Sequence, residues 1–396
     1  MTDILATWEL GLRYGHVAML DALAAPLVEA GHTVTLAAKD LVTVAALPNP
    51  RFARVIQAPL YLRRPPRRTA TITYGQVIAD AGFAEPQAIE ALVKAWLVLF
   101  DLAKPDMIVA EHAPVSLLAA HIAGIPVVRI GTAFSAPPAI RPMPRLISRT
   151  VAPAGPDDDP DREIDAAIEG TLSRFDRPAV GGIAGLLGQS IEFLTSWPEL
   201  DFAGTRAGRA YYGPLLSFGG TARPAWPTGD GPRTFLYMPF EHPAATALIE
   251  LLGARGWPAI WHAQGTPPQA LPPSIHYSPE PVDIDAILTE AAVLVGRAGH
   301  GLSSATLRHG VPSLVFPDTL EAGLVASCLI RAALAVMPRK PSGTAIAEGL
   351  DTLTTDPRIA AACAQIRLRY GRYDPVAAAK RMAADILATT RPATIS

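Results

Sequence analysis

The sequence predicts an α/β fold made of two successive domains, each with a parallel sheet between layers of helices. A chain of 396 residues is longer than one hydrophobic core usually serves. Strand and helix patterns alternate in both halves, and a segment rich in Gly, Pro and Thr separates them. We therefore expect domains over 1–216 and 234–375, a linker over 217–233, and a final segment over 376–396.

The first half opens with a β-α-β pattern. Apolar residues recur at helical spacing from Val17 to Leu27, between two short strand candidates. This order predicts one right-handed crossover unit, and the same pattern returns further along. The strands are expected at 3–7, 32–38, 105–110 and 125–130, with a helix through 117–123. Tyr61 to Thr73, which holds Arg63, Arg64, Arg67 and Arg68, and Ala152 to Arg162 are expected to be loops.

The second half repeats this pattern. Strands are expected at 234–238, 259–262, 275–277 and 292–295, and helices at 244–254 and 284–291. A last helix over 376–389 is a candidate to cross back onto the N-terminal domain. Open α/β sheets bind ligands at the carboxyl ends of their strands, so two such domains facing each other predict a ligand cleft between them.

Charge and cysteine content exclude several classes of protein. The chain has 34 basic and 36 acidic residues, and its positive charges are scattered, which argues against nucleic acid as a partner. Cys328 and Cys363 are too few for a disulfide framework, and no His or carboxylate cluster has the spacing of a metal site. A reducing compartment is favoured.

The hydropathy pattern predicts a soluble, cytoplasmic protein that is a monomer or homodimer. No run of 18 apolar residues occurs, so no membrane segment is expected. Asp3 and Glu9 stand near the N-terminus, where a signal peptide would have basic residues and then an apolar stretch.

The segment Gly296 to Pro312, GRAGHGLSSATLRHGVP, is a candidate anion site. Its glycines follow a predicted strand and precede a helix, where free backbone N–H groups and the helix dipole favour a phosphate. By itself, a glycine-rich turn between a strand and a helix is equally compatible with a tight turn that binds nothing.

Four segments together resemble a known family. They are GHVAMLDALAAPLVEAGHTVTLAA in the first half and SPEPVDIDAIL, GRAGHGLSSATLRHGVPSLVFP and LEAGLVAS in the second. They resemble the family 1-like glycosyltransferases of GT-B fold, which include plant and bacterial nucleotide-sugar-dependent natural-product glycosyltransferases. The resemblance implies two Rossmann-like domains facing a central cleft.

The resemblance also implies roles for residues of the second half. The backbone of Val282 would contact the nucleobase, and Glu321 and Ala322 would meet the donor sugar. The diphosphate would be held by Arg297, Gly299, His300, Gly301, Leu302 and Ser303.

In the family, a His in the first strand-to-helix loop is the general base, and His16 matches it. An acceptor hydroxyl must lose its proton before it attacks, and imidazole titrates near neutrality. An acid at the end of a later strand often orients that His, which points to Glu111. Both residues could instead be helix caps or packing residues.

The donor motifs depart from the family pattern. Arg297 replaces a His, and Leu302 replaces a Thr or Ser. Ala322 and Val325 stand where Gln and Asn are common. A pocket that hydrogen-bonds fewer hydroxyls selects for them less strongly. We therefore expect a less hydroxylated donor, such as a deoxysugar, or a relaxed or lost donor preference.

These observations predict an inverting, metal-independent glycosyltransferase that needs no cofactor. Its co-substrate would be a UDP- or dTDP-linked sugar, and its acceptor a small aromatic or hydrophobic molecule, or an anionic one if the arginine cluster contacts it. The main alternative is an auxiliary or binding protein with a degenerate donor site. An epimerase would need more acidic residues in the cleft. A dehydrogenase is disfavoured because the first loop, GLRYGH, lacks a dinucleotide fingerprint.

Overall fold

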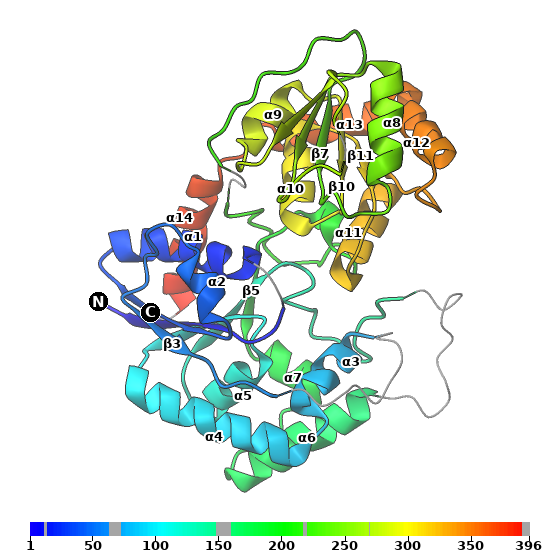
Figure 1. Ribbon diagram of the computed structural model, residues 1–396. Coiled ribbons are helices and arrows are strands. Elements are labelled where there is room, and N and C mark those ends of the chain that lie inside the picture. Colours follow the sequence, from blue (N-terminus) through cyan, green and yellow to red (C-terminus); the bar gives the residue numbers. More distant parts are fainter. Residues whose placement is uncertain (12–13, 63–72, 148–159, 217–219, 269, 390–396) are drawn as a thin grey trace. The chain divides into compact units, whose positions relative to one another are not determined.

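The computed structural model describes residues 1–11, 14–62, 73–147, 160–216, 220–268 and 270–389. It divides into two compact units, each drawn in Figure 1. Unit 1 comprises residues 1–198 and 203–215 together with the chain from Val376 onward. Unit 2 comprises residues 199–202 and 216–375. The arginine cluster of the first half and the predicted loop residues 152–159 lie outside the described residues.

Unit 1 is built on a six-stranded parallel sheet with strand order β3-β2-β1-β4-β5-β6. The strands are β1 (Asp3–Trp8), β2 (Thr33–Ala38), β3 (Arg54–Gln57), β4 (Met107–Glu111), β5 (Val127–Gly131) and β6 (Ile191–Leu194). β1 and β4 lie side by side at the centre, in a register that pairs Trp8 with Glu111. The carboxyl ends of these two strands therefore meet.

Helices flank this sheet. They are α1 (Gly15–Glu29), α2 (Leu41–Ala45), α3 (Tyr74–Ile78), α4 (Pro86–Ala103), α5 (Pro114–Ala123), α6 (Pro160–Arg174), α7 (Gly182–Gly188) and α14 (Pro375–Thr389), with the short η1 (Ala79–Phe83). α14 packs with unit 1, where the Tyr212 hydroxyl donates to Asp385 over 2.6 Å and Met382 and Ile386 are buried.

Unit 2 repeats the architecture with strand order β12-β11-β10-β7-β8-β9, again all parallel. Its strands are β7 (Thr234–Tyr237), β8 (Ala259–His262), β9 (Ile275–Ser278), β10 (Val293–Gly296), β11 (Ser313–Val315) and β12 (Ala335–Val336). Its helices are α8 (Ala245–Arg255), α9 (Ile284–Glu290), α10 (His300–His309), α11 (Leu320–Arg331), α12 (Gly343–Thr355) and α13 (Pro357–Tyr370), and the 3₁₀ turn η2 (Pro198–Leu200) reaches into it.

Two sequence predictions about element boundaries are wrong. α1 begins at Gly15, so His16 lies in the first helical turn and not before it. α6 begins at Pro160, so residues 160–162 are helical and not part of a loop. Proline suits the first position of a helix, and the acids Asp161 and Glu163 favour its first turn.

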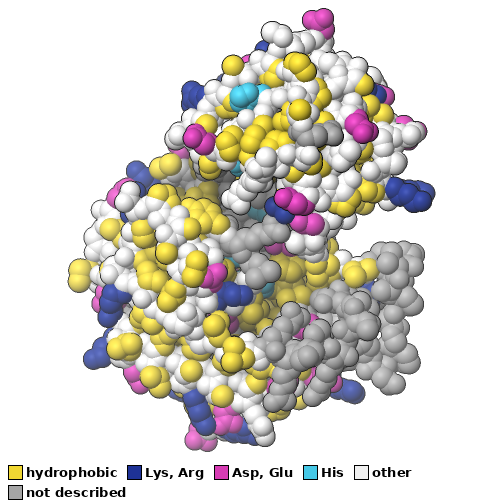
Figure 2. All heavy atoms as spheres, viewed as in Figure 1, with side chains coloured by type: hydrophobic (Ala, Val, Ile, Leu, Met, Phe, Trp, Pro, Cys, Tyr) yellow, Lys and Arg dark blue, Asp and Glu magenta, His cyan; other side chains and the backbone are white. Residues whose placement is uncertain are grey.

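The surface carries charges of both signs. Figure 2 shows Lys and Arg side chains interspersed with Asp and Glu over the face drawn. Among the helices of the described residues, none is both long and apolar enough to span a bilayer.

Candidate active site

A His–carboxylate pair lies at the carboxyl ends of β1 and β4. Glu111 ends β4 and is fully buried, and His16 Nδ1 lies 2.9 Å from each of its carboxylate oxygens. A carboxylate accepts hydrogen bonds, so a bond from Nδ1 to Glu111 corresponds to the tautomer that has its proton on Nδ1 and its lone pair on Nε2. The two residues predicted to act together are therefore in contact.

The His16 ring is held between two other groups. Trp8 stacks on it with ring centroids 5.6 Å apart. On the other nitrogen, a Cβ added to Gly11 would come within 2.2 Å of Nε2, and Gly11 has a φ of +85°. Only glycine suits a position with that backbone angle and that close an approach. The loop after β1 thus shapes the surroundings of the reactive nitrogen.

That loop is fastened to the loop after β4. Glu9 accepts hydrogen bonds from the backbone N–H groups of Val115 (2.9 Å) and Ser116 (2.6 Å) at the start of α5. The Leu10 N–H donates to the His112 carbonyl over 3.0 Å. Lys39 Nζ, after β2, donates to the Gly11 carbonyl over 2.9 Å. Glu9 was not singled out from the sequence, because nothing near it in the chain shows what it contacts.

Burial dominates the electrostatics of Glu9. Its removal from water raises its pKa to about 8, although the amides of Val115 and Ser116 oppose that rise. Glu9 is therefore a buried acid whose charge changes within the neutral range.

His112, directly after Glu111, forms the next part of the site. Its Nε2 is 2.9 Å from the Tyr74 hydroxyl, and its ring centroid is 6.1 Å from that of His16. Its backbone has a φ of +44°, an unusual angle for a residue with a side chain. Burial lowers the pKa of His112 well below its usual value, with His16 and Lys39 adding to the effect. His112 is thus a neutral imidazole at neutral pH.

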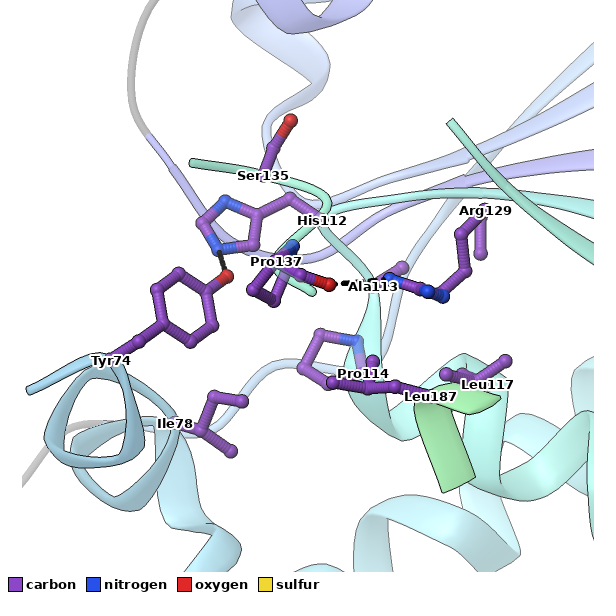
Figure 3. Close-up of a pocket in the computed structure, with 11 residues that line it drawn as sticks. Tyr74, Ile78, His112, Ala113, Pro114, Leu117, Arg129, Ser135, Pro137 and Leu187 are labelled. Atoms are coloured by element: carbon purple, nitrogen blue, oxygen red, sulfur yellow. Dashed lines mark hydrogen bonds between the residues drawn. The ribbon is translucent and has the colours of Figure 1, made fainter. Parts of the chain in front are cut away.

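A small, partly open pocket lies beside His112 (Figure 3). Its wall combines aliphatic side chains with a few buried polar ones, the composition of a site for a small organic ligand. The lining residues are Tyr74, Ile78, Ala110, His112, Ala113, Pro114, Leu117, Arg129, Ser135, Pro137 and Leu187.

Arg129 is the one charged side chain in that wall. Its guanidinium donates to the Pro137 carbonyl and the Ser190 hydroxyl and pairs with Glu192 at 3.3 Å. Burial lowers its pKa to about 10, which still leaves it cationic at neutral pH. Tyr74 and Arg129 were missed by sequence analysis because they are far from His16 in the chain.

In unit 2, the predicted diphosphate turn connects β10 to α10. Gly299 is the N-cap, and the first intrahelical bond runs from the Ser303 N–H to the Gly299 carbonyl. The first N–H groups of a helix point out of its start, and in α10 these include the groups of Gly301 and Leu302. Burial lowers the pKa of His300 to about 4, so it adds no charge to this turn at neutral pH.

The side chains of the turn face different ways. Leu302 packs against the hydrophobic core of unit 2, and Ser303 is 2% exposed. Ser304 is 0% exposed. Neither serine therefore places a hydroxyl at the surface to replace the hydroxyl that is absent at Leu302. The backbone groups at the start of α10 are thus the main candidates in this turn to contact an anion.

Arg297 lies beside that turn and forms an ion pair with Asp318, Nη1 to Oδ2, over 2.8 Å. Asp318 follows β11, the strand next to β10. His242, after β7, accepts from the Ala244 N–H at the start of α8 and packs on Phe316. Sequence analysis did not single out Asp318.

The remaining donor-site residues are distributed around the same sheet. Glu321 is partly exposed in the first turn of α11, whereas Ala322 and Val325 are buried. Val282 is buried, and its carbonyl accepts from the Gly220 N–H. The roles of these residues toward base and sugar stay predictions. No cluster of three potential metal ligands occurs among the residues described.

No protein-family model matches the chain, and no curated protein matches it in sequence. Solved structures do match. The glycotransferase of kitacinnamycin matches with 19% identity and a TM-score of 0.68, over 98% of this chain and 99% of its own. CalG4, the calicheamicin glycosyltransferase, matches with 17% identity and a TM-score of 0.70, over 99% of this chain and 100% of its own.

A third match is the glycosyltransferase VinC, solved in complex with dTDP, with 18% identity and a TM-score of 0.66 over 98% of this chain and 99% of its own. Each of these proteins is similar to the chain along nearly its whole length. The fold class inferred from the sequence, α/β of the GT-B type with two Rossmann-like domains, is therefore confirmed.

The raised pKa of Glu9 predicts how stability depends on pH. An acid whose folded-state pKa exceeds its unfolded value of 4.5 contributes stability at low pH that is lost as pH rises through about 8. The stability advantage of the natural protein over Glu9→Gln should shrink between pH 5 and pH 8 and then level off. Thermal unfolding of both proteins across this range measures it. An advantage that is constant with pH would show that Glu9 does not titrate there.

Proposed function

We propose that the protein is an inverting glycosyltransferase that moves a sugar from a nucleoside diphosphate to a small aromatic or hydrophobic acceptor, without a metal ion. The observation that carries this proposal is the bond between His16 Nδ1 and the buried Glu111. It lies in a fold shared with glycosyltransferases of natural-product biosynthesis.

His16 would act as the general base. Its Nε2 takes the proton of the acceptor hydroxyl as the oxygen attacks the anomeric carbon, and Glu111 stabilises the imidazolium that forms. Glu111 would also keep the ring in the tautomer whose lone pair is on Nε2. Attack from the face opposite the leaving group inverts the anomeric centre.

Unit 2 would stabilise the leaving nucleoside diphosphate. Charge grows on the diphosphate as the glycosidic bond breaks, and the amides of His300, Gly301 and Leu302 at the start of α10 would receive it. Arg297 would add a positive charge once it turns from Asp318 to a phosphate oxygen. No divalent cation is needed for this role. A nucleoside diphosphate linked to uridine or thymidine is the proposed donor.

The cavity beside His112 would take the acceptor. Its aliphatic wall and the rings of Tyr74 and His112 suit a planar apolar molecule. On the donor side, the buried Ala322 and Val325 offer no hydrogen bonds to sugar hydroxyls. A deoxysugar would leave fewer groups unpaired there than glucose would, so we propose a deoxysugar donor.

The role of His16 predicts that His16→Gln lowers turnover by roughly 10²- to 10⁴-fold, because a general base contributes about that factor. Turnover is measured with a panel of nucleotide sugars and aromatic acceptors. The matched control is His309→Gln, which removes the His of another His–carboxylate pair, with Asp285 at 2.9 Å in unit 2. The control should keep full turnover. Unchanged turnover in His16→Gln would remove His16 from the mechanism.

The ion pair of Arg297 predicts opposite effects on nucleotide binding. Asp318→Asn releases Arg297 and removes a negative charge, so a nucleoside diphosphate should bind about tenfold more tightly. Arg297→Ala should weaken its binding about tenfold. Each change in Kd is equivalent to about 1.4 kcal/mol. Isothermal titration with UDP and dTDP measures both. Arg308→Ala is the control. It also removes an arginine that is paired with an aspartate, Asp285, but Arg308 is in the last turn of α10, at the end opposite the diphosphate turn. Equal affinities in all three variants would exclude a diphosphate at Arg297.

A second candidate function is a glycosyltransferase-like auxiliary or binding protein with a degenerate donor site. Two observations favour it: the Leu302 side chain packs against the core and offers no hydroxyl, and Arg297 is paired with Asp318. The nucleotides separate the two functions, because a ligand at 100 times its Kd stabilises the fold by about 2.7 kcal/mol. If neither UDP nor dTDP raises the unfolding temperature, the auxiliary function is favoured.

A further inference from the structure

One buried carboxyl connects the loop that precedes His16 to the helix that follows Glu111. We propose that Glu9 is a positioning residue: it holds these two segments together and thereby sets the hydrogen bond between His16 and Glu111. The inference rests on the proposed function, in which that bond orients the general base. Glu9 itself contacts neither the acceptor nor the donor in this mechanism.

The start of α5 lacks a cap of its own. Its N-cap residue, Ala113, has no side chain that could accept a hydrogen bond, and Pro114 has no N–H. The next two N–H groups, of Val115 and Ser116, both donate to the Glu9 carboxyl. The Leu117 N–H then makes the first helical bond, to the Ala113 carbonyl. Glu9 therefore replaces the cap that α5 lacks in its own sequence.

Glu9 is close in the chain to His16, and its partners are close in the chain to Glu111. It comes directly after β1 and seven positions before His16, while α5 begins three positions after Glu111. The Leu10 N–H adds a bond to the His112 carbonyl, and Trp8 Nε1 donates to the Leu10 carbonyl. Glu9 thus supplies two of the three hydrogen bonds described here between the loop after β1 and the segment after β4.

The hydrogen bonds of Glu9 lie in a buried environment. Glu9 is 7% exposed, so its bonds to the amides are shielded from water, and a hydrogen bond in such surroundings is stronger than one in water. The other titratable groups of these loops are His16, Glu111, His112 and Lys39. Without the carboxyl, the buried amides of Val115 and Ser116 lose their hydrogen-bond partner. Fewer hydrogen bonds then hold the loop after β1 against the start of α5. The His16 ring can then leave the bidentate contact with Glu111.

The experiment observes the His16 ring directly. The full-length protein is labelled with ¹³C and ¹⁵N in histidine, and the His16 signals are assigned from their loss in His16→Gln. In the natural protein, we expect a single tautomer with the proton on Nδ1. In Glu9→Ala, we expect a mixture of both tautomers. Glu9→Gln keeps one acceptor oxygen and should give an intermediate spectrum.

The matched control is Glu169→Ala. Glu169 also accepts hydrogen bonds from backbone N–H groups at the start of a helix, those of Gly181 and Gly182 before and within α7. Its loss should lower the unfolding temperature and leave the His16 signals unchanged. A change of the His16 spectrum in this control as large as in Glu9→Ala would reduce Glu9 to a general stability residue and overturn the proposal.

A natural His16 spectrum in folded Glu9→Ala would also overturn it. If Glu9→Ala does not fold, Glu9→Gln decides: a shifted tautomer balance supports the proposal, and an unchanged one contradicts it. These spectra need neither donor nor acceptor, so they test Glu9 even if no transferase activity is found. Where activity is measurable, kcat in Glu9→Gln should fall by up to about a hundredfold, as small misplacements of catalytic groups do, with the donor KM unchanged. A fall in kcat equal to that of Glu169→Ala would contradict the proposal.

Discussion

The fully buried carboxylate of Glu111 is the constraint around which unit 1 is arranged. A buried carboxyl group needs hydrogen-bond partners, and His16 Nδ1 lies 2.9 Å from both oxygens of Glu111. The parallel pairing of β1 and β4 brings the two loops to one edge of the sheet. Trp8, Gly11 and Glu9 then fix the first loop closely enough for the bond to form. His112, whose ring centroid lies 6.1 Å from that of His16, lines the pocket.

The two units use the same architecture for different chemistry. At the carboxyl edge of its sheet, unit 1 places side chains that can move a proton. Unit 2 places backbone N–H groups at the start of α10, beside an Arg297–Asp318 pair that carries no net charge.

The sequence predicted the features that depend on local pattern. Buried strands of continuous apolar residues, such as Val293–Gly296, were predicted from the sequence directly. So was the location of His16 after one strand and of Glu111 at the end of another. β3 was not predicted, because it is a short edge strand with mostly exposed residues and little apolar alternation. Glu9 and Asp318 were missed because their partners lie 21 or more residues away. The inward orientation of Leu302 depends on core packing that one sequence does not show.

The central claim is that His16, oriented by Glu111, activates the acceptor for direct displacement at the anomeric carbon. The most direct test is the anomeric configuration of the product, determined by proton NMR coupling constants, when the donor is an α-linked nucleotide sugar. A single direct displacement predicts a β-linked product. An α-linked product would contradict the account, because retention requires a mechanism other than one base-assisted attack.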